Sequence, residues 1–319
     1  MTRIGFHASH EQVSPRQLLA DVQHAERAGF DMAMCSDHFS PWSSRHGHSG
    51  YAWAWLGAAL ATTELTLGCV SAPGQRYHPA VHAQKIATLG QMFPGRFWVA
   101  LGSGEASNEH ITGDRWPDKE RRTRRLEECV EVIGRMLDGE EVTHRGLVRV
   151  DRARLWEVAD PRPLLIGPAV TVSSAARVAA WADGLVTINQ PVEVLRELLA
   201  AYRDAGGRGR AALQIHLSWA PTEDRAEAIA YDQWRTNVFT EPVNWDTETA
   251  AAFDQMGEHV DLEAVRAAVH VSSDLGRHRE WLTEYADLGF DDLYLHFVGQ
   301  DQAPFIDAFS TDVLPALRG

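Results

Sequence analysis

The sequence has little cysteine, no excess of positive charge and no long apolar run, and each shortage excludes a class of protein. Its three cysteines are scattered without a C-x-x-C spacing, which argues against a zinc site or a disulfide framework and favours a reduced, cytoplasmic protein. The net charge of −14 argues against nucleic acid or an anionic membrane as a partner. No apolar stretch approaches membrane-spanning length, and the first residues lack the form of a signal peptide.

Strand-like and helix-like segments alternate along most of the 319 residues. The strand-like segments are residues 4–8, 31–36, 65–70, 97–101, 164–167, 185–188, 211–219 and 292–298. Strands that alternate with helices pair in parallel through right-handed crossovers. Since no linker, repeat or low-complexity stretch divides the chain, we expect one α/β domain over residues 1–319, a (β/α)8 TIM barrel with inserted segments.

Two segments interrupt this alternation. Residues 141–150 have the form of a hairpin around Arg145-Gly146. After a predicted helix over residues 222–238, residues 240–249 form an irregular insertion, which we expect to act as a lid. Residues 305–317 are predicted to close the chain as one helix.

The stretch Ser36-Asp37-His38-Phe39 places an acid and an imidazole where a buried strand ends. Adjacent side chains of an extended strand point to opposite faces, so Asp37 and His38 share one pocket only if the chain turns, as Pro41 indicates. In a barrel, functional residues lie at the C-terminal ends of the strands. On this stretch alone, a helix-capping Asp and a packed His are equally well supported.

Further polar and glycine residues follow the other predicted strands. Glu11 follows the first strand and Trp42 the second, while Cys69 and Val70 end the third. The later strand ends add Gly102, Ser103, Gly104, Glu105, Asn108, Ala169, Val170 and Thr171. Imidazoles, carboxylates and an aromatic side chain around one mouth suit proton abstraction beside an apolar ring.

Two other motifs partly match known site patterns. Gly102-x-Gly104 partly mimics the dinucleotide fingerprint, but Ser107 replaces its third glycine, so the glycines better suit close approach of a flat ligand to the backbone. His78 and His82 have the spacing of metal ligands on a helix, yet no acid accompanies them. Capping or packing is the preferred interpretation for this pair, and no metal site is predicted.

Three motifs occur together and carry a family resemblance. They are Ser36-Asp37-His38-Phe39-x-Pro41-Trp42, Gln75-Arg76-Tyr77-His78-Pro79 and Gly102-Ser103-Gly104-Glu105-Ala106-x-Asn108-Glu109. Together they resemble the bacterial luciferase-like family of flavin and deazaflavin oxidoreductases, in the branch around deazaflavin-dependent glucose-6-phosphate dehydrogenase. The resemblance implies a (β/α)8 barrel, a homodimer, and a cofactor in the mouth that is either FMN or coenzyme F420, an 8-hydroxy-5-deazaflavin.

The resemblance also implies roles for individual residues. His38 would take the hydroxyl proton during hydride transfer, Trp42 would stack in the pocket, and Glu105 and Glu11 would tune protonation. Asp37 would lie near the cofactor ring. The other implied cofactor contacts are Cys69, Val70, Gly102, Ser103, Gly104, Asn108, Ala169, Val170 and Thr171.

The chain departs from the family pattern where the substrate phosphate would bind. Residues 187–190 lack the expected cations, and Ala267-Ala268 replaces a Lys-Arg pair. A dianion without charged donors binds poorly, so we expect a small hydroxyl or carbonyl substrate other than glucose 6-phosphate. Two alternatives stay open, an FMN-dependent monooxygenase and a noncatalytic flavin-binding protein.

Overall fold

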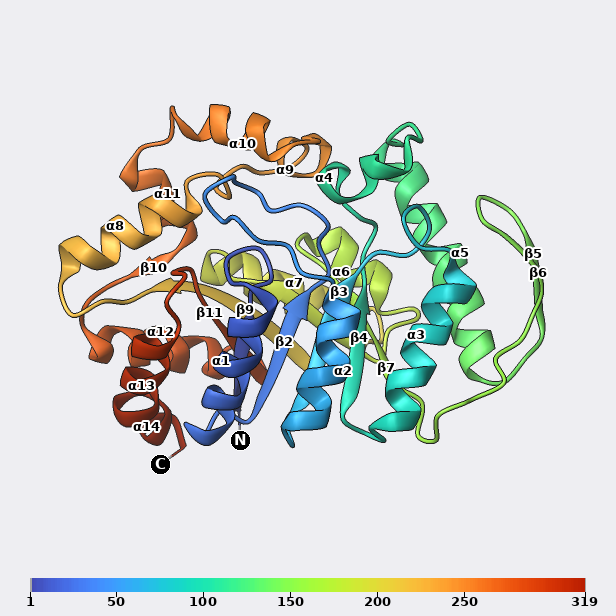
Figure 1. Cartoon of the computed structure of the whole chain (residues 1–319), viewed down its shortest axis with the longest axis horizontal. Coiled ribbons are helices and arrows are strands. Elements are labelled where there is room, and N and C mark those ends of the chain that lie inside the picture. The colour runs from blue at the N-terminus through green and yellow to red at the C-terminus, as the bar shows by residue number, and fades with distance from the viewer. Residues whose placement is uncertain (1, 319) are drawn as a thin grey trace.

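Eight parallel strands close into a barrel in the computed structural model, which describes residues 2–318 (Figure 1). The strands, in spatial order, are β1 (Arg3–Ala8), β2 (Met32–Ser36), β3 (Thr66–Ser71), β4 (Phe97–Leu101), β7 (Leu164–Pro168), β8 (Gly184–Ile188), β9 (Ala211–Ser218) and β11 (Asp292–Phe297). Pairing of β8 with β9 and of β11 with β1 closes the ring. The predicted (β/α)8 TIM barrel is confirmed.

The strands are apolar on both faces because both faces are covered. Along β2, Ala33 and Cys35 pack outward against the helices, while Met32 and Met34 fill the barrel interior. Parallel strands buried in this way read as continuous apolar runs. The sequence therefore locates the strands well but does not show which side chain faces which layer.

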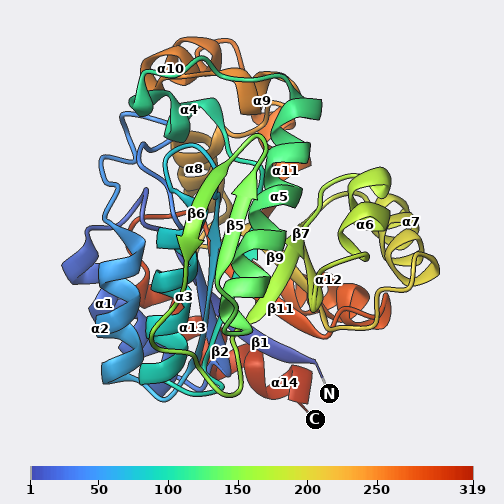
Figure 2. The ribbon, with the colours of Figure 1, turned by 90° about the vertical axis from the view of Figure 1, so that its right-hand side faces the viewer.

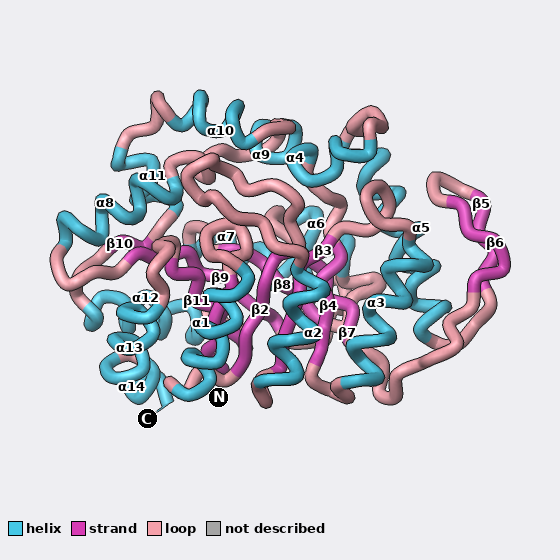
Figure 3. Tube along the Cα trace, in the orientation of Figure 1, coloured by secondary structure: helices cyan, strands magenta, loops and turns pink. Residues whose placement is uncertain are grey.

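Helices surround the barrel (Figure 3). They are α1 (Pro15–Arg27), α2 (Ala52–Thr62), α3 (Pro79–Met92), α5 (Lys119–Leu137), α6 (Val172–Val178), α7 (Val192–Asp204), α8 (Glu223–Trp234), α12 (Leu275–Asp287), α13 (Ala303–Asp312) and α14 (Leu314–Arg318). Several of them begin with a capping residue, as at α1, where Ser14 accepts from the backbone of Gln17 and Pro15 occupies the first turn. No helix within residues 2–318 is long and apolar enough to cross a membrane.

Insertions gather at two places. The hairpin of β5 (Val142–Arg145) and β6 (Arg149–Ala153) lies outside the barrel beside α5 (Figure 2). The other insertions lie over the end of the barrel where the strands finish (Figure 1). They comprise α4 (Ala106–Glu109), a 3-10 helix (His110–Thr112), α9 (Val243–Asp246), α10 (Ala250–Gly257), α11 (Leu262–Ala268) and β10 (His270–Val271).

Two predicted helices differ from the structure. The helix predicted over residues 222–238 ends at Trp234, because the following residues turn to line a cavity. The single terminal helix predicted over residues 305–317 is wrong: α13 ends at Asp312 and α14 begins at Leu314. Pro315 has no N–H with which to continue the hydrogen-bond ladder of α13, which accounts for the break.

Candidate active site

A cavity of about 810 Å³ opens at the C-terminal ends of the strands. The predicted site residues on its wall are Asp37, His38, Trp42, Val70, Gly102, Ser103, Gly104, Glu105, Asn108, Ala169, Val170 and Thr171. They come from the ends of β2, β3, β4 and β7, which lie next to one another in the sheet. Strand order thus brings together residues that are far apart in the sequence.

His38 and Glu11 form a close pair at this cavity. His38 Nδ1 lies 2.5 Å from Glu11 Oε1, and Ser9 Oγ donates to the other carboxylate oxygen at 2.8 Å. Glu11 is 1% exposed and lies behind His38 rather than on the cavity wall. The contact fixes the imidazole by one nitrogen and leaves the second, Nε2, for other partners.

The pair has shifted pKa values. Burial disfavours the imidazolium, but the charge and hydrogen bond of Glu11 outweigh burial and raise the pKa of His38 to about 9. Burial likewise opposes the Glu11 carboxylate, yet His38 and its hydrogen bond lower the pKa of Glu11 to about 2. In the free protein at pH 7, His38 is therefore an imidazolium that can donate a proton. This differs from the predicted base with a pKa near neutrality.

Trp42, Glu105 and Asn108 hold the loop that follows His38. Asn108 Oδ1 accepts from the backbone N–H of Phe39 at 2.8 Å and of Ser40 at 3.2 Å. Its Nδ2 donates to Glu105 Oε2 at 3.3 Å, and Trp42 Nε1 donates to the same oxygen at 3.3 Å. The Trp42 ring meets the His38 ring edge to face, with centroids 4.6 Å apart. The chain turns after β2, as Pro41 predicted.

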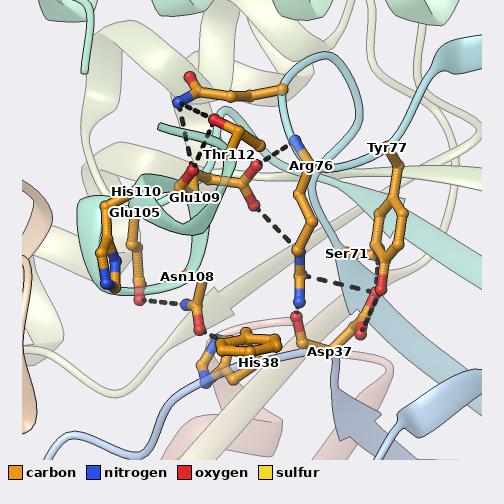
Figure 4. Close-up of polar contacts among 12 residues, drawn as sticks. Asp37, His38, Ser71, Arg76, Tyr77, Glu105, Asn108, Glu109, His110 and Thr112 are labelled. Atoms are coloured by element: carbon orange, nitrogen blue, oxygen red, sulfur yellow. Dashed lines mark hydrogen bonds and ion pairs between the residues drawn. The ribbon is translucent and has the colours of Figure 1, made fainter. Parts of the chain in front are cut away.

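The Asp37 carboxylate is almost fully enclosed by hydrogen-bond donors (Figure 4). The donors are Trp53 Nε1 at 2.8 Å, Ser71 Oγ at 2.7 Å and Tyr77 Oη at 3.2 Å. Arg76 adds a contact from its guanidinium to the backbone carbonyl of Asp37 at 2.6 Å. Such a set holds the carboxylate in one orientation at the cavity wall.

Arg76 links Asp37 to a second buried acid, Glu109. Its backbone N–H donates to Glu109 Oε2 at 2.7 Å, and its Nε lies 3.4 Å from Oε1 (Figure 4). Burial raises the pKa of Glu109 even though Arg76 opposes the shift. The sequence motifs contain Arg76, Tyr77 and Glu109 but predict no role for them, because the pairing of two loops depends on the closed barrel.

Cys69 does not contact the cavity. It is fully buried in the core between barrel and helices, in register with Cys35, while its neighbour Val70 faces the cavity. This corrects the prediction that Cys69 contacts a cofactor, since successive side chains of β3 alternate between the two faces. Thr171 does line the cavity, but its hydroxyl caps α6 by accepting from Ser174 N at 3.2 Å.

The insertion after α8 forms part of the cavity wall. Thr240, Glu241, Asn244 and Trp245 all line the cavity. Asp246, at the end of α9, accepts from Trp116 Nε1 at 2.9 Å and from Arg122 at 3.1 Å, which ties the insertion to the start of α5. The segment expected to act as a lid therefore forms part of the cavity wall and is hydrogen-bonded to the start of α5.

His78 is a capping residue. Its Nδ1 accepts from Ala80 N at 3.2 Å at the start of α3, and its ring also contacts the carbonyl of Arg149 at 2.8 Å. His82 instead packs against Trp53. Over residues 2–318, no group of three or more His, Cys, Asp or Glu side chains is placed to hold a metal ion.

A family model described as luciferase-like monooxygenase matches residues 1–292. The chain belongs to this family. Membership confirms the resemblance and the predicted enzyme class, a flavin- or deazaflavin-dependent oxidoreductase.

Several relatives of this luciferase-like chain carry more specific names. It is 36% identical to a protein named F420-dependent glucose-6-phosphate dehydrogenase from Intrasporangium calvum, with 100% of both chains covered. A protein of the same name from Beutenbergia cavernae is 35% identical, with 100% and 98% covered. These names contradict the expectation that the substrate is not glucose 6-phosphate.

A solved structure gives a further comparison. It is the structure of an F420-dependent secondary alcohol dehydrogenase in complex with an F420-acetone adduct. This luciferase-like chain is 28% identical to it, with a TM-score of 0.91 over 100% of this chain and 99% of that chain. A tetrahydromethanopterin reductase from Methanopyrus kandleri, 19% identical with a TM-score of 0.78, shares the fold.

Proposed function

We propose that this protein transfers a hydride between coenzyme F420 and a small hydroxyl or carbonyl compound, with His38 moving the accompanying proton. The observation that carries the proposal is the contact of 2.5 Å between His38 and Glu11 beside the cavity. An imidazole that faces the cavity and is held by a buried carboxylate is suited to exchange one proton with a substrate oxygen. The names of the relatives and of the alcohol dehydrogenase structure support F420 and this substrate class.

The cavity suits a flat ring. A Cβ placed on Gly102 would meet only Pro168 at 3.7 Å and a carbonyl at 3.9 Å, so the backbone is open there. Gly104 has a φ of +86°, which a side chain rarely adopts. We propose that Asp37, Val70, Gly102, Ser103, Gly104, Asn108, Ala169, Val170 and Thr171 surround the cofactor. F420 bound there would supply or accept the hydride.

The residues of the chain control the proton and the water. For carbonyl reduction, the His38 imidazolium donates its Nε2 proton to the substrate oxygen, and Glu11 stabilises the charged form before the transfer. For alcohol oxidation, the neutral imidazole accepts the proton. Trp42 covers His38 from the side and keeps water from the exchange. Glu105 accepts a hydrogen bond from the Trp42 indole N–H and so holds the Trp42 ring in place beside His38.

Side-by-side titration with F420 and FMN tests the choice of cofactor. F420 fluorescence quenched by the protein at low micromolar concentrations supports the proposal. Binding of FMN alone would instead favour the monooxygenase, which oxygen consumption with reduced FMN and a substrate panel would then reveal. If neither compound binds at tens of micromolar, the proposal is wrong.

His38→Ala separates an enzyme from a noncatalytic flavin-binding protein. The change removes the proton-transfer group and leaves the backbone around the cofactor site in place. We expect F420 affinity close to wild type and loss of turnover. An unchanged rate of F420 reduction would mean that His38 is not the proton-transfer group.

We also propose that the protein is a homodimer in the cytoplasm. Its three cysteines are free and buried, as suits a reducing compartment. Helix α2 exposes Ala54, Ala58 and Ala61, small apolar side chains that suit close packing of a second copy. Light scattering after size-exclusion chromatography distinguishes the monomer of 35.4 kDa from the dimer.

A further inference from the structure

Lys85 occupies a pocket of aromatic rings behind the cavity. Its Nζ lies 3.2 Å from the centroid of the Tyr77 ring and 4.4 Å from that of the Trp53 ring. Tyr51 lies further away, at 6.0 Å. The three rings come from α2, the residue before it and the loop that precedes α3, whereas Lys85 projects from α3 itself.

The ammonium group has no polar partner. Within residues 2–318, Nζ of Lys85 is buried without a hydrogen-bond acceptor, and no carboxylate lies within ion-pair distance of it. Burial lowers its pKa to about 8, against the attraction of Asp37. Lysine is itself rare here: the chain has 30 lysines and arginines, and only Lys85 and Lys119 are lysines. Ring faces therefore stabilise this charge in place of hydrogen bonds.

The two nearest rings connect this cation to Asp37. Trp53 and Tyr77 turn their faces to the ammonium of Lys85, and their polar edges donate hydrogen bonds to the Asp37 carboxylate at 2.8 and 3.2 Å. A cation above an aromatic face withdraws electron density from the ring, which makes the N–H or O–H at the ring edge a stronger donor. A buried cation and a buried anion are thereby coupled through two rings without touching.

We propose that Lys85 is a positioning residue for the reaction, because it fixes the Trp53 and Tyr77 rings and strengthens their hydrogen bonds to Asp37 at the cofactor site. The role of Asp37 beside the cofactor rests on the proposed function. The arrangement of Lys85, the rings and Asp37 does not, so the two can be tested separately.

The first arm of the test uses the free protein. With 13Cζ-labelled tyrosine, the six tyrosines give few NMR signals, and Tyr77→Phe identifies the one from Tyr77. Lys85→Met keeps the aliphatic stem and removes the charge, so we expect the Tyr77 signal to move. Lys85→Arg keeps the charge and should restore it toward wild type, and Lys119→Met, at the other lysine, should leave it in place. An unmoved Tyr77 signal in folded Lys85→Met overturns the proposal.

The second arm is a double-mutant cycle on F420 affinity. We expect Lys85→Met to weaken F420 binding by about tenfold in the wild-type background but by less than about twofold when Asp37 is already Asn. Equal losses in both backgrounds would mean that Lys85 acts by packing alone and would overturn the proposal. If Lys85→Met does not fold, Lys85→Gln replaces it in both arms. If wild-type protein binds no F420, the proposed function fails, and the tyrosine signal alone decides the role of Lys85.

Discussion

His38 Nδ1 and Glu11 Oε1 lie 2.5 Å apart, with the carboxylate buried behind the imidazole and the imidazole at the cavity wall. The two residues come from different strand ends, since Glu11 follows β1 and His38 follows β2. Parallel pairing of these strands brings them into contact. The contact determines the protonation state of the only imidazole among the predicted site residues.

Glu11→Gln is expected to shift the pH dependence of turnover toward acid. The Glu11 anion raises the pKa of His38 to about 9, so its removal lowers that pKa. Carbonyl reduction needs the imidazolium; its rate should be level below the pKa of His38 and fall above it. In the variant this fall begins at lower pH, and turnover at pH 8 drops by about 10- to 100-fold. Rate profiles from pH 6 to about pH 10 measure the shift.

The reverse reaction provides the internal control for Glu11→Gln. Alcohol oxidation needs the neutral imidazole, so its rate in wild type should rise with pH until about pH 9. In the variant this rise should end at lower pH. Profiles that are identical in wild type and Glu11→Gln would show that Glu11 does not set the pKa of His38.

Asn108→Ala is expected to loosen the loop that carries His38. The change removes the acceptor of two backbone N–H groups, at Phe39 and Ser40, and the donor to Glu105. Each of these part-buried hydrogen bonds contributes about 1 kcal/mol or less to the free energy of unfolding. Urea denaturation measures this cost. A variant as stable as wild type, with unchanged turnover, would show that Asn108 does not hold the loop.

Asp246→Ala is expected to release the insertion from α5. Asp246 accepts from Trp116 and Arg122, and its own side chain is 48% exposed, so the loss of unfolding free energy should be under about 1 kcal/mol. The local effect should be larger, as faster amide hydrogen exchange over residues 240–249. Asp232→Ala, which removes an exposed pair with Arg45, is the matched control. Equal rates of amide hydrogen exchange over residues 240–249 in both variants would show that Asp246 does not hold the insertion against α5.

The barrel could be predicted from the sequence because its signal is local and repeated. Each strand is a short apolar run followed by a helix, and several of these helices begin with a capping residue, such as Ser14 before α1. The site could be predicted in part for the same reason: residues at strand ends meet in a barrel wherever they occur in the chain. Asp37, His38 and Gly102, for example, were predicted from their position at strand ends and do line the cavity.

The remaining features depend on contacts that no local pattern encodes. The orientation of Cys69 follows from which side chain of β3 faces inward, and a continuous apolar run does not show this. The insertion helices α10 and α11 are short, at eight and seven residues, and weakly patterned. The pKa of His38 depends on Glu11, a neighbour 27 positions away in the chain, and the burial of both.

F420 reduction by an alcohol panel tests the central claim most directly. Wild-type protein, Glu11→Gln and His38→Ala are mixed with F420 and with 2-propanol, other small alcohols or glucose 6-phosphate, and the loss of F420 fluorescence is followed. At pH 7 we predict a substrate-dependent loss with wild type, a loss at least as fast with Glu11→Gln because more of its His38 is neutral there, and none with His38→Ala, although all three bind F420. Equal rates for wild type and His38→Ala would contradict it.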